Sequence, residues 1–319
     1  MSFKNKDNEA KIISIVIPVF NEEQSIKTLY REISQVGKEN SIDFEIVFVD
    51  DGSTDGTFEV IENIHAKDRR IKALRFRNNV GKAEALAAGF SVSRGDYIVT
   101  MDGDLQDDPA EIPSLLEKLN QGYDLVSGWK KKRKDPLTKR IPSFIYNKVT
   151  SLLSGIPIHD FNCGLKIYRR EVVNHLHLYG ELHRFIPVLA KWEGFRIGEV
   201  KVHHRKRKFG KTKYGFNRFF EGLFDFITVQ FLTKYMKRPL HFFGIIGLLS
   251  SFSGTAIIVY LIILKLEKIS YLSNRPLLFI GVMLLIIGIQ FISIGLIGEM
   301  ITRTYSRDNS FPIQKKLGV

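Results

Sequence analysis

The chain has 319 residues, of which 44% are hydrophobic and 25% are charged. This composition excludes a disordered chain and a collagen-like repeat, because neither carries so many apolar side chains. Lys and Arg number 47 against 34 Asp and Glu, a formal net charge of +13. A surplus of this size is typical of proteins with an anionic partner, such as nucleic acid, a phosphorylated substrate or an acidic membrane. Cys163 is the single cysteine, so neither an internal disulfide nor a cysteine zinc cluster can form.

The first part of the chain alternates runs rich in Ile and Val with segments of helical spacing. Strands are expected at Ile12–Val19, Phe44–Val49, Ile71–Phe76 and Tyr97–Met101, and helices at Glu23–Lys38, Thr57–Lys67 and Lys82–Ser93. This alternation predicts an α/β fold, a mostly parallel sheet with helices on both faces, in which ligands bind at the carboxyl ends of the strands. No G-x-G-x-x-G opens a helix after the first strand and no P-loop pattern occurs, which disfavours those two nucleotide-binding modes.

Two long apolar stretches lie in the last third of the chain. Residues 239–264 and 276–298 contain no Asp, Glu, Lys or Arg, and each is longer than the roughly 20 residues that a helix needs to cross a bilayer. A buried core helix is the alternative, but such stretches are rare in soluble domains, so two transmembrane helices are expected. Before them, residues 216–238 mix Phe, Leu and Ile with charged side chains. This mixture predicts amphipathic helices at the membrane interface, with packing against the soluble domain as the alternative.

Basic side chains on the outer flanks of the two spans predict the orientation. The flanks hold Lys234, Lys237, Arg238, Arg303, Arg307, Lys315 and Lys316, whereas the loop between the spans holds Lys265, Lys268 and Arg275 opposed by Glu267. The positive-inside rule therefore places both termini in the cytoplasm of a protein of the inner cell membrane. The expected organisation is a cytoplasmic domain at 1–215, interfacial helices at 216–238, a two-helix hairpin at 239–302 and a cytoplasmic tail at 303–319.

Small residues recur on one side of each expected span, at Gly247, Ser251 and Gly254 and at Gly281, Gly288 and Gly295. Small side chains let two helices approach closely. The pattern fits packing within the hairpin and equally a homo-oligomer formed through these helices.

Acidic residues follow two of the expected strands. Asp102 and Asp104 flank a glycine after the strand at Tyr97–Met101, and side chains two apart share one side of an extended chain. Their oxygens, with that of Gln106, suit Mg²⁺ or Mn²⁺ on a diphosphate. Asp50–Thr57 follows another strand, and one of its carboxylates could accept a hydrogen bond from a nucleobase. A plain turn is the alternative for both clusters, because Asp and Gly favour turns and helix caps.

Four short segments occur together in a fixed order. They are P-V-F-N-E at 18–22, V-D-D-G-S-T-D-G-T at 49–57, N-V-G-K at 79–82 and M-D-G-D-L-Q at 101–106. Together they resemble family 2 glycosyltransferases, which have the Rossmann-like GT-A fold. With the two spans, the chain resembles the polyprenyl-phosphate branch, which includes dolichol-phosphate mannose synthases and bactoprenol glucosyltransferases.

The resemblance implies roles for the matching residues. Those implied to bind the nucleotide are Pro18, Phe20, Glu22, Asp50, Asp51, Lys82 and Asp102. Asp102, Asp104 and Gln106 would hold the Mg²⁺ or Mn²⁺. Asp160 matches an acidic residue near the donor sugar, and a turn or capping residue is its alternative. Asp104, Asp160 and Arg207 form the expected catalytic set.

Two basic runs, at 130–140 and 205–213, are candidates for binding the acceptor. The resemblance implies that Lys130, Arg140, Arg207 and Lys213 bind its phosphate, and that R-x-x-G-x-T-K at 207–213 is a loop that closes over the active site. The alternative is a solvated face or attraction to anionic lipid.

The expected activity is inverting, metal-dependent transfer of a hexose from a nucleotide sugar to polyprenyl (undecaprenyl) phosphate at the cytoplasmic membrane face. UDP-glucose is the preferred donor and GDP-mannose the alternative. A phosphate nucleophile is largely dianionic at pH 7, so no strong general base is required. The rival from another class is a noncatalytic membrane scaffold that binds nucleotide sugar. A processive synthase is disfavoured because only two spans occur and a Gln-x-x-Arg-Trp motif is absent. No nucleic-acid partner is expected.

Overall fold

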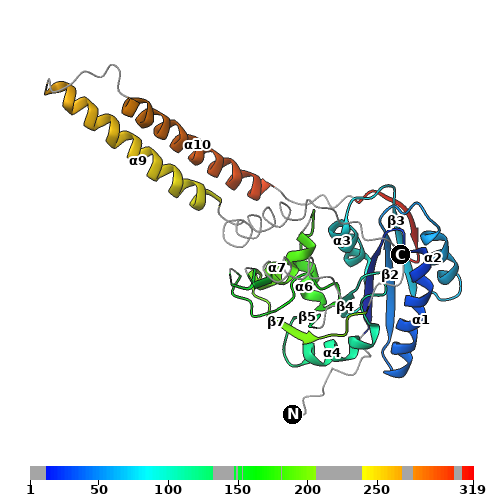
Figure 1. Cartoon of the computed structure of the whole chain (residues 1–319). Coiled ribbons are helices and arrows are strands. Elements are labelled where there is room, and N and C mark those ends of the chain that lie inside the picture. Colours follow the sequence, from blue (N-terminus) through cyan, green and yellow to red (C-terminus); the bar gives the residue numbers. More distant parts are fainter. Residues whose placement is uncertain are drawn as a thin grey trace, which may run out of the picture. The chain divides into compact units, whose positions relative to one another are not determined.

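The computed structural model describes residues 12–131, 147–205 except 149, 153 and 181, 239–267, 276–304 and 311–319. These residues form two compact units. One unit contains the N-terminal domain together with the last residues of the chain, and the other contains the two long helices (Figure 1). The expected interfacial segment at 216–238 lies outside the described residues.

The N-terminal unit is built on one eight-stranded sheet with the order β7-β5-β6-β4-β1-β2-β3-β8. The pairs β1–β2, β1–β4, β2–β3 and β5–β7 are parallel, whereas β6 and β8 run antiparallel to their neighbours. The strands are β1 (Ile13–Val19), β2 (Phe44–Asp50), β3 (Ile71–Phe76), β4 (Tyr97–Thr100), β5 (Leu125–Trp129), β6 (Lys166–Arg169), β7 (Ile197–Lys201) and β8 (Ile313–Leu317). Because β1 lies between β2 and β4, the strand order reverses beside it, which is where open α/β sheets form their ligand crevice.

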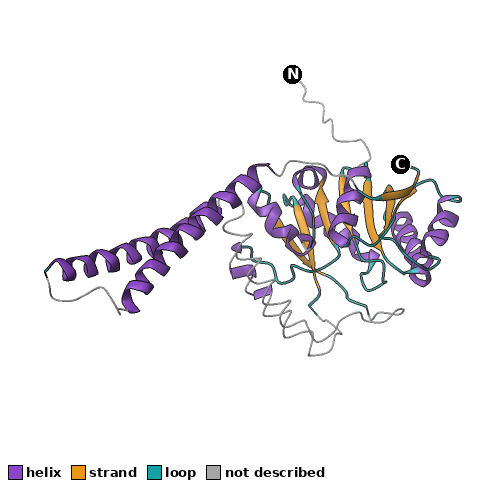
Figure 2. Cartoon of the chain, turned by 90° about the horizontal axis from the view of Figure 1, so that it is seen from above, coloured by secondary structure: helices purple, strands orange, loops and turns teal. Residues whose placement is uncertain are grey.

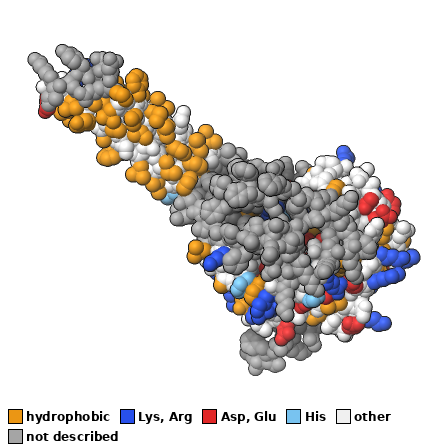
Figure 3. All heavy atoms as spheres, in the orientation of Figure 1, with side chains coloured by type: hydrophobic (Ala, Val, Ile, Leu, Met, Phe, Trp, Pro, Cys, Tyr) orange, Lys and Arg blue, Asp and Glu red, His pale blue; other side chains and the backbone are white. Residues whose placement is uncertain are grey.

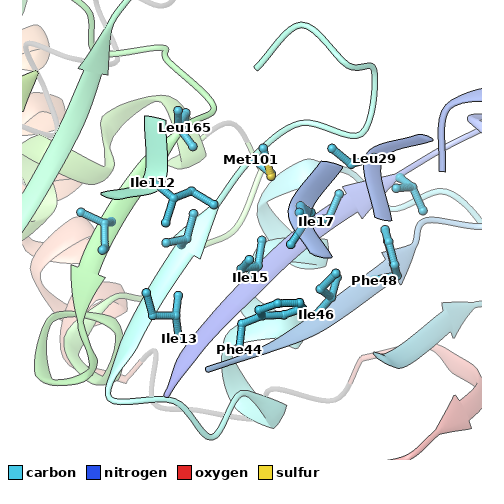
Figure 4. Packing of buried hydrophobic residues seen from close by; sticks show 14 of the residues in the cluster. Ile13, Ile15, Ile17, Leu29, Phe44, Ile46, Phe48, Met101, Ile112 and Leu165 are labelled. Atoms are coloured by element: carbon cyan, nitrogen blue, oxygen red, sulfur yellow. The ribbon is translucent and has the colours of Figure 1, made fainter. Parts of the chain in front are cut away.

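Helices cover both faces of this sheet, as the sequence predicts (Figure 2). The α-helices are α1 (Glu23–Glu39), α2 (Thr57–His65), α3 (Lys82–Val92), α4 (Ile112–Asn120), α6 (Arg170–His175) and α7 (Ile186–Trp192), and the 3₁₀ turns are η1 (Pro109–Glu111) and η2 (Leu182–Phe185). Alternate residues of β1 and β2, such as Ile15 and Ile46, point into one core with Leu29 of α1 (Figure 4). The bounds of the elements expected before residue 101 differ from the sequence prediction by at most two residues.

Helix α3 lies so close to the sheet that one of its positions must be glycine. A Cβ added at Gly89 would overlap Cγ1 of Val16 in β1 and lie 3.2 Å from Cγ2 of Val49 in β2. The Ala-rich sequence of α3 supports the same close approach. Since Lys82 is the first residue of α3, this packing also sets the position of a predicted site residue.

We expect Gly89→Ala to lower the thermal denaturation midpoint, although alanine in place of glycine favours an isolated helix by about 1 kcal/mol. Overpacking of this kind costs roughly 1–3 kcal/mol. Val16→Ala removes the overlapping methyl group, so the double variant should lose less stability than the two single losses added together. A Gly89→Ala protein more stable than the wild type would contradict the close packing of α3.

The second unit consists of α9 (Pro239–Leu266) and α10 (Pro276–Thr304). Both helices are long and apolar enough to cross a membrane, with mean hydropathies of 2.1 and 2.7, and few of their side chains are buried. The face seen in Figure 3 is covered with hydrophobic side chains. These features confirm the two expected apolar helices and indicate a membrane-associated protein.

The glycines of the hairpin face each other. A Cβ at Gly247 would lie 2.6 Å from the carbonyl oxygen of Gly288, and a Cβ at Gly254 would lie 2.6 Å from that of Gly281. The small residues therefore serve contact between α9 and α10 themselves. A homo-oligomer stays a prediction.

The last residues of the chain contribute a strand that the sequence analysis treated only as part of a tail. β8 pairs with the edge strand β3, the backbone N–H of Arg77 donates to the carbonyl of Pro312 at 3.0 Å, and Phe311 stacks on Phe76. Lys315 also forms an ion pair with Glu62 of α2. The chain thus returns after the hairpin to the domain from which it left.

Candidate active site

The carboxyl ends of β2, β1 and β4 meet at one edge of the sheet. The residues that follow these strands include most of the sequence-predicted nucleotide and metal residues. A small pocket lies here, and its charged or titratable lining residues include Lys82, Asp102, Lys166 and His183. The geometry therefore brings the predicted acidic turn and the predicted Lys82 together.

The acidic turn after β4 is held by its own hydrogen bonds. The backbone N–H of Asp102 donates to Oδ2 of Asp107 at 3.1 Å, and that of Gln106 donates to Oδ1 of Asp104 at 3.1 Å. Leu105 between them has a φ of 63°, in the left-handed region that a tight turn requires. Asp107, which the sequence analysis did not single out, is 1% exposed and closes the turn.

Two lysines from different elements neutralise this turn. Lys82 Nζ lies 2.5 Å from Oδ1 of Asp102, and Lys130, just after β5, lies 2.8 Å from Oδ1 of Asp107. Burial by itself would raise the pKa of Asp102, but Lys82 and Lys130 hold it well below its usual range. Burial would likewise lower the pKa of Lys130, but Asp107 holds it above its usual range. Lys82, Asp102 and Lys130 are therefore charged at neutral pH.

The oxygen atoms of the turn fit a hard divalent cation. Asp102, Asp104 and Gln106 offer two carboxylates and an amide, the donor types that Mg²⁺ and Mn²⁺ prefer. A Cβ at Gly164 would lie 2.6 Å from Oδ2 of Asp102, so the glycine leaves that carboxylate its space. Within the described ranges no cluster of three or more His, Cys, Asp or Glu residues is formed. Two carboxylates and one amide would fill only part of an octahedral coordination sphere, which would leave positions for ligand oxygens.

The two carboxylates at the end of β2 organise loops. Oδ1 of Asp50 accepts the backbone N–H of Ser53 at 2.9 Å. Asp51 accepts the N–H groups of Val80 and Gly81 at 2.8 and 3.0 Å, one on each oxygen. Burial raises the pKa of both carboxyl groups. Both side chains lie at the expected edge, and their part in reading a nucleobase stays a prediction.

The residues that follow β1 lie beside this loop. Pro18, the last residue but one of β1, lines the pocket. Phe20 is half-buried immediately after the strand. The backbone N–H of Glu22 donates to Oγ1 of Thr57 at 2.9 Å, and its carboxylate accepts from the Ser25 hydroxyl at 3.0 Å. The first and second predicted segments are therefore joined directly.

Comparison with known proteins identifies the family of this chain. Residues 14–176 match the family described as Glycosyl transferase family 2. The chain is 39% identical over 305 residues to the dodecaprenyl-phosphate galacturonate synthase of Rhizobium johnstonii. The aligned region covers 94% of this chain and 90% of the relative. The chain belongs to glycosyl transferase family 2. The expected resemblance to this family and to its polyprenyl-phosphate branch is confirmed.

Solved structures of glucosyl-3-phosphoglycerate synthase from Mycobacterium tuberculosis share the fold of this family 2 glycosyltransferase. The complex with Mn²⁺ and UDP-glucose has a TM-score of 0.54 at 21% identity, over 70% of this chain and 79% of that one. The complex with Mn²⁺, UDP and glucosyl-3-phosphoglycerate has a TM-score of 0.55 at 20% identity, over 70% and 80%. The likeness confirms the expected fold class.

Asp160 is 1% exposed. Besides Asp104, it is the expected catalytic residue that lies within the described part of the glycosyltransferase. Its backbone N–H donates to Oε1 of Glu199 at 3.1 Å, and its carbonyl accepts from the Ser127 hydroxyl at 3.3 Å. These bonds fix the backbone beside the pocket, and its role toward the sugar stays a prediction. Three predicted residues lie outside the described residues: Arg140, Arg207 and Lys213.

Arg205 shows that the start of the second basic run is anchored to the acidic turn. Its backbone N–H donates to the carbonyl of Gln106 at 3.0 Å. Its guanidinium forms ion pairs with Asp108 at 2.7 Å and Glu32 at 2.6 Å. Arg205 is therefore a structural cation rather than part of a solvated face.

Sequence reasoning also missed Lys166 and His183, which line the pocket. Lys166 opens the apolar strand β6, and a lysine at a buried strand position was the available signal. His183 stands in the 3₁₀ turn η2, for which no motif was quoted. Burial, followed by the charge of Lys82, lowers the pKa of His183 to about 3, so its imidazole is neutral at pH 7.

This half-buried histidine predicts a specific pH dependence of stability. Its folded pKa lies below the ordinary value, so the unfolded chain binds more protons between about pH 3 and pH 6.5. The free energy of unfolding should therefore fall as the pH drops below about 6.5, by up to roughly 1.4 kcal/mol per pH unit from this group.

His183→Gln should flatten this loss in thermal denaturation between about pH 6.5 and 5. His177→Gln, at an exposed histidine, should keep the wild-type dependence. Equal slopes for wild type and His183→Gln would contradict the assignment of a neutral imidazole with a lowered pKa.

Proposed function

We propose that this glycosyltransferase moves a sugar from a nucleotide sugar to the phosphate of a polyprenyl phosphate at the membrane. The observation that carries the proposal is the acidic turn held against Lys82 and Lys130 at the switch point of the sheet. The name of the Rhizobium relative supports the polyprenyl phosphate acceptor, and the apolar helices α9 and α10 support a lipid-bound site. Two donor sugars are candidates: glucose, from the family resemblance, and galacturonate, from the relative's name.

The proposed chemistry requires positive charge at the turn to stabilise the departing diphosphate. Asp102, Asp104 and Gln106 would hold Mg²⁺ or Mn²⁺, which supplies positive charge to the departing diphosphate when bound. Lys82 and Lys130, already beside the turn, contribute fixed positive charge at the same place. The acceptor phosphate attacks the anomeric carbon with inversion, and it needs no strong base because it is largely ionised at pH 7.

The basic segment after Arg205 is proposed to contact the acceptor phosphate. In the sequence, only one residue separates Arg207 from Arg205, whose guanidinium and backbone are bound at the acidic turn. Arg140 and Lys213 complete the proposed acceptor site by family resemblance.

We also propose that both ends of the chain lie in the cytoplasm. The pairing of β8 with β3 supports an even number of membrane crossings, because strands on opposite sides of a bilayer cannot pair. Lys237 and Arg238 before α9 and Arg303 and Arg307 after the apolar part of α10 support the cytoplasmic side through the positive-inside rule.

The test uses the full-length protein in lipid nanodiscs with undecaprenyl phosphate, Mn²⁺ or Mg²⁺, and labelled UDP-glucose or UDP-galacturonate. We expect a lipid product that has gained one sugar and no phosphate, together with released UDP. Asp104→Asn should lower the rate on the order of 10²–10³-fold, as does loss of one preorganised charge-stabilising group.

Asp124→Asn is the matched control, because Asp124 binds the backbone of Arg196 at the opposite edge of the sheet and should leave transfer unchanged. Donor hydrolysis without a lipid product would contradict acceptor recognition. Release of UMP would indicate transfer of a sugar phosphate and contradict the chemistry, and full turnover in excess EDTA would overturn the metal assignment.

A further inference from the structure

Lys166 is a buried lysine in the pocket at the carboxyl ends of the strands, and burial lowers the pKa of its ammonium group. It is the first residue of β6, it is 3% exposed, and it lines the same pocket as Lys82 and Asp102. Its Nζ donates to the backbone carbonyl of Cys163. Among the described residues, no carboxylate lies within ion-pair distance of Lys166, although taking an ammonium group out of water is unfavourable without an opposite charge. Such a position marks a group kept for binding rather than for stability.

Burial and the charge of Lys82 oppose the charged form of Lys166, whereas the carboxylates of Asp160 and Asp102 favour it. Lys82 and Asp102 cancel each other through their ion pair. His183 is neutral at pH 7, and burial raises the pKa of the Cys163 thiol to about 12, so neither offers a counter-charge. An anion bound in the pocket would favour the charged form of Lys166 against the effect of burial.

The donor diphosphate and an acidic sugar are the two sources of such an anion. Lys166 pairs in register with Thr100, which precedes Asp102 by two residues along β4. Its backbone therefore lies deeper in the sheet than the turn proposed to hold the metal and diphosphate. Gly164, two residues before Lys166 in the sequence, lies against the Asp102 carboxylate and leaves it space. This placement favours a group that extends past the turn into the pocket, which is the sugar.

We propose that Lys166 binds the carboxylate of a hexuronic acid and thereby selects a uronate donor over a neutral hexose. The inference rests on the proposed function, because it names the sugar that the same site transfers. The name of the Rhizobium relative contains galacturonate, a sugar of this class. A hydrogen bond between two charged groups is roughly twice as strong as one between neutral groups, so the C6 carboxylate gains more from Lys166 than a C6 hydroxyl does.

The test compares donors that differ only at C6. Full-length wild type and Lys166→Met in nanodiscs with undecaprenyl phosphate are given UDP-galacturonate or UDP-galactose, and UDP-glucuronate or UDP-glucose. We expect the wild type to prefer the uronate of at least one pair. Lys166→Met should lower kcat/KM for that uronate by roughly 10–100-fold and leave the neutral partner within about threefold. Direct binding of the two donors without acceptor should show the same loss of preference.

Folding is controlled within the same experiment. Methionine has a similar length and no charge, so the denaturation midpoint of Lys166→Met should equal or exceed that of the wild type. Lys72→Met is the matched control: Lys72 is also buried, but it pairs with Glu45 at 2.6 Å at the amino end of the strands. This control should lose stability, because Glu45 is left unpaired, and should keep the sugar preference.

Three results would overturn the assignment of Lys166. Equal losses for both donors of a pair would place Lys166 on the diphosphate, and an unchanged preference would make it structural. A wild type that prefers the neutral hexose would refute uronate selection while the proposed function stands. Absence of transfer with all four donors would instead overturn the proposed function and this inference with it.

Discussion

The turn after β4 concentrates negative charge, and the rest of the site depends on how that charge is balanced. Asp102 and Asp107 belong to one short turn, yet their counter-ions come from distant parts of the chain, Lys82 from α3 and Lys130 from the end of β5. Each cation reaches the turn only because the sheet places β1, β4 and β5 in the right order and α3 packs tightly on β1. The global fold is thus what makes a clustered acidic turn tolerable.

The same arrangement suits a reaction between anions. A nucleotide diphosphate and a lipid phosphate repel each other, and fixed cations in a partly dehydrated site reduce that repulsion more effectively than mobile ions in water. Lys82, Lys130 and Lys166 supply such charges from three different elements. The return of β8 to the sheet adds a second covalent connection between this domain and the apolar hairpin.

Much of this fold can be predicted from local patterns. The Ile- and Val-rich runs and the amphipathic segments located the strands and helices up to β4 within two residues, because each has the period of its own secondary structure. β8 could not be found this way. Its sequence I-Q-K-K-L is a short edge strand with two lysines, and edge strands need neither strict alternation nor high hydropathy. The facing glycines of α9 and α10 were visible as a pattern, but only the structure shows that they face each other.

The site residues also fall into those that local motifs predict and those that only the structure shows. The acidic turn and Lys82 were found because short motifs carry their chemistry. Asp107 pairs with Lys130 and His183 lines the pocket only because the fold brings these residues to the site, which no spacing rule reveals. Asp50 and Asp51 belong to a motif that the sequence shows. Only the structure shows that their carboxylates accept hydrogen bonds from backbone N–H groups.

The central claim is that the donor diphosphate binds at the turn after β4 through a divalent cation. Calorimetric titration of the full-length protein in detergent with UDP, with and without Mn²⁺, tests this claim most directly. The account predicts that Mn²⁺ raises the UDP affinity of the wild type by at least about tenfold and that Asp102→Asn abolishes this gain, because the carboxylate then contributes no charge to the cation. UDP binding of equal strength with and without Mn²⁺, or an undiminished gain in Asp102→Asn, would contradict it.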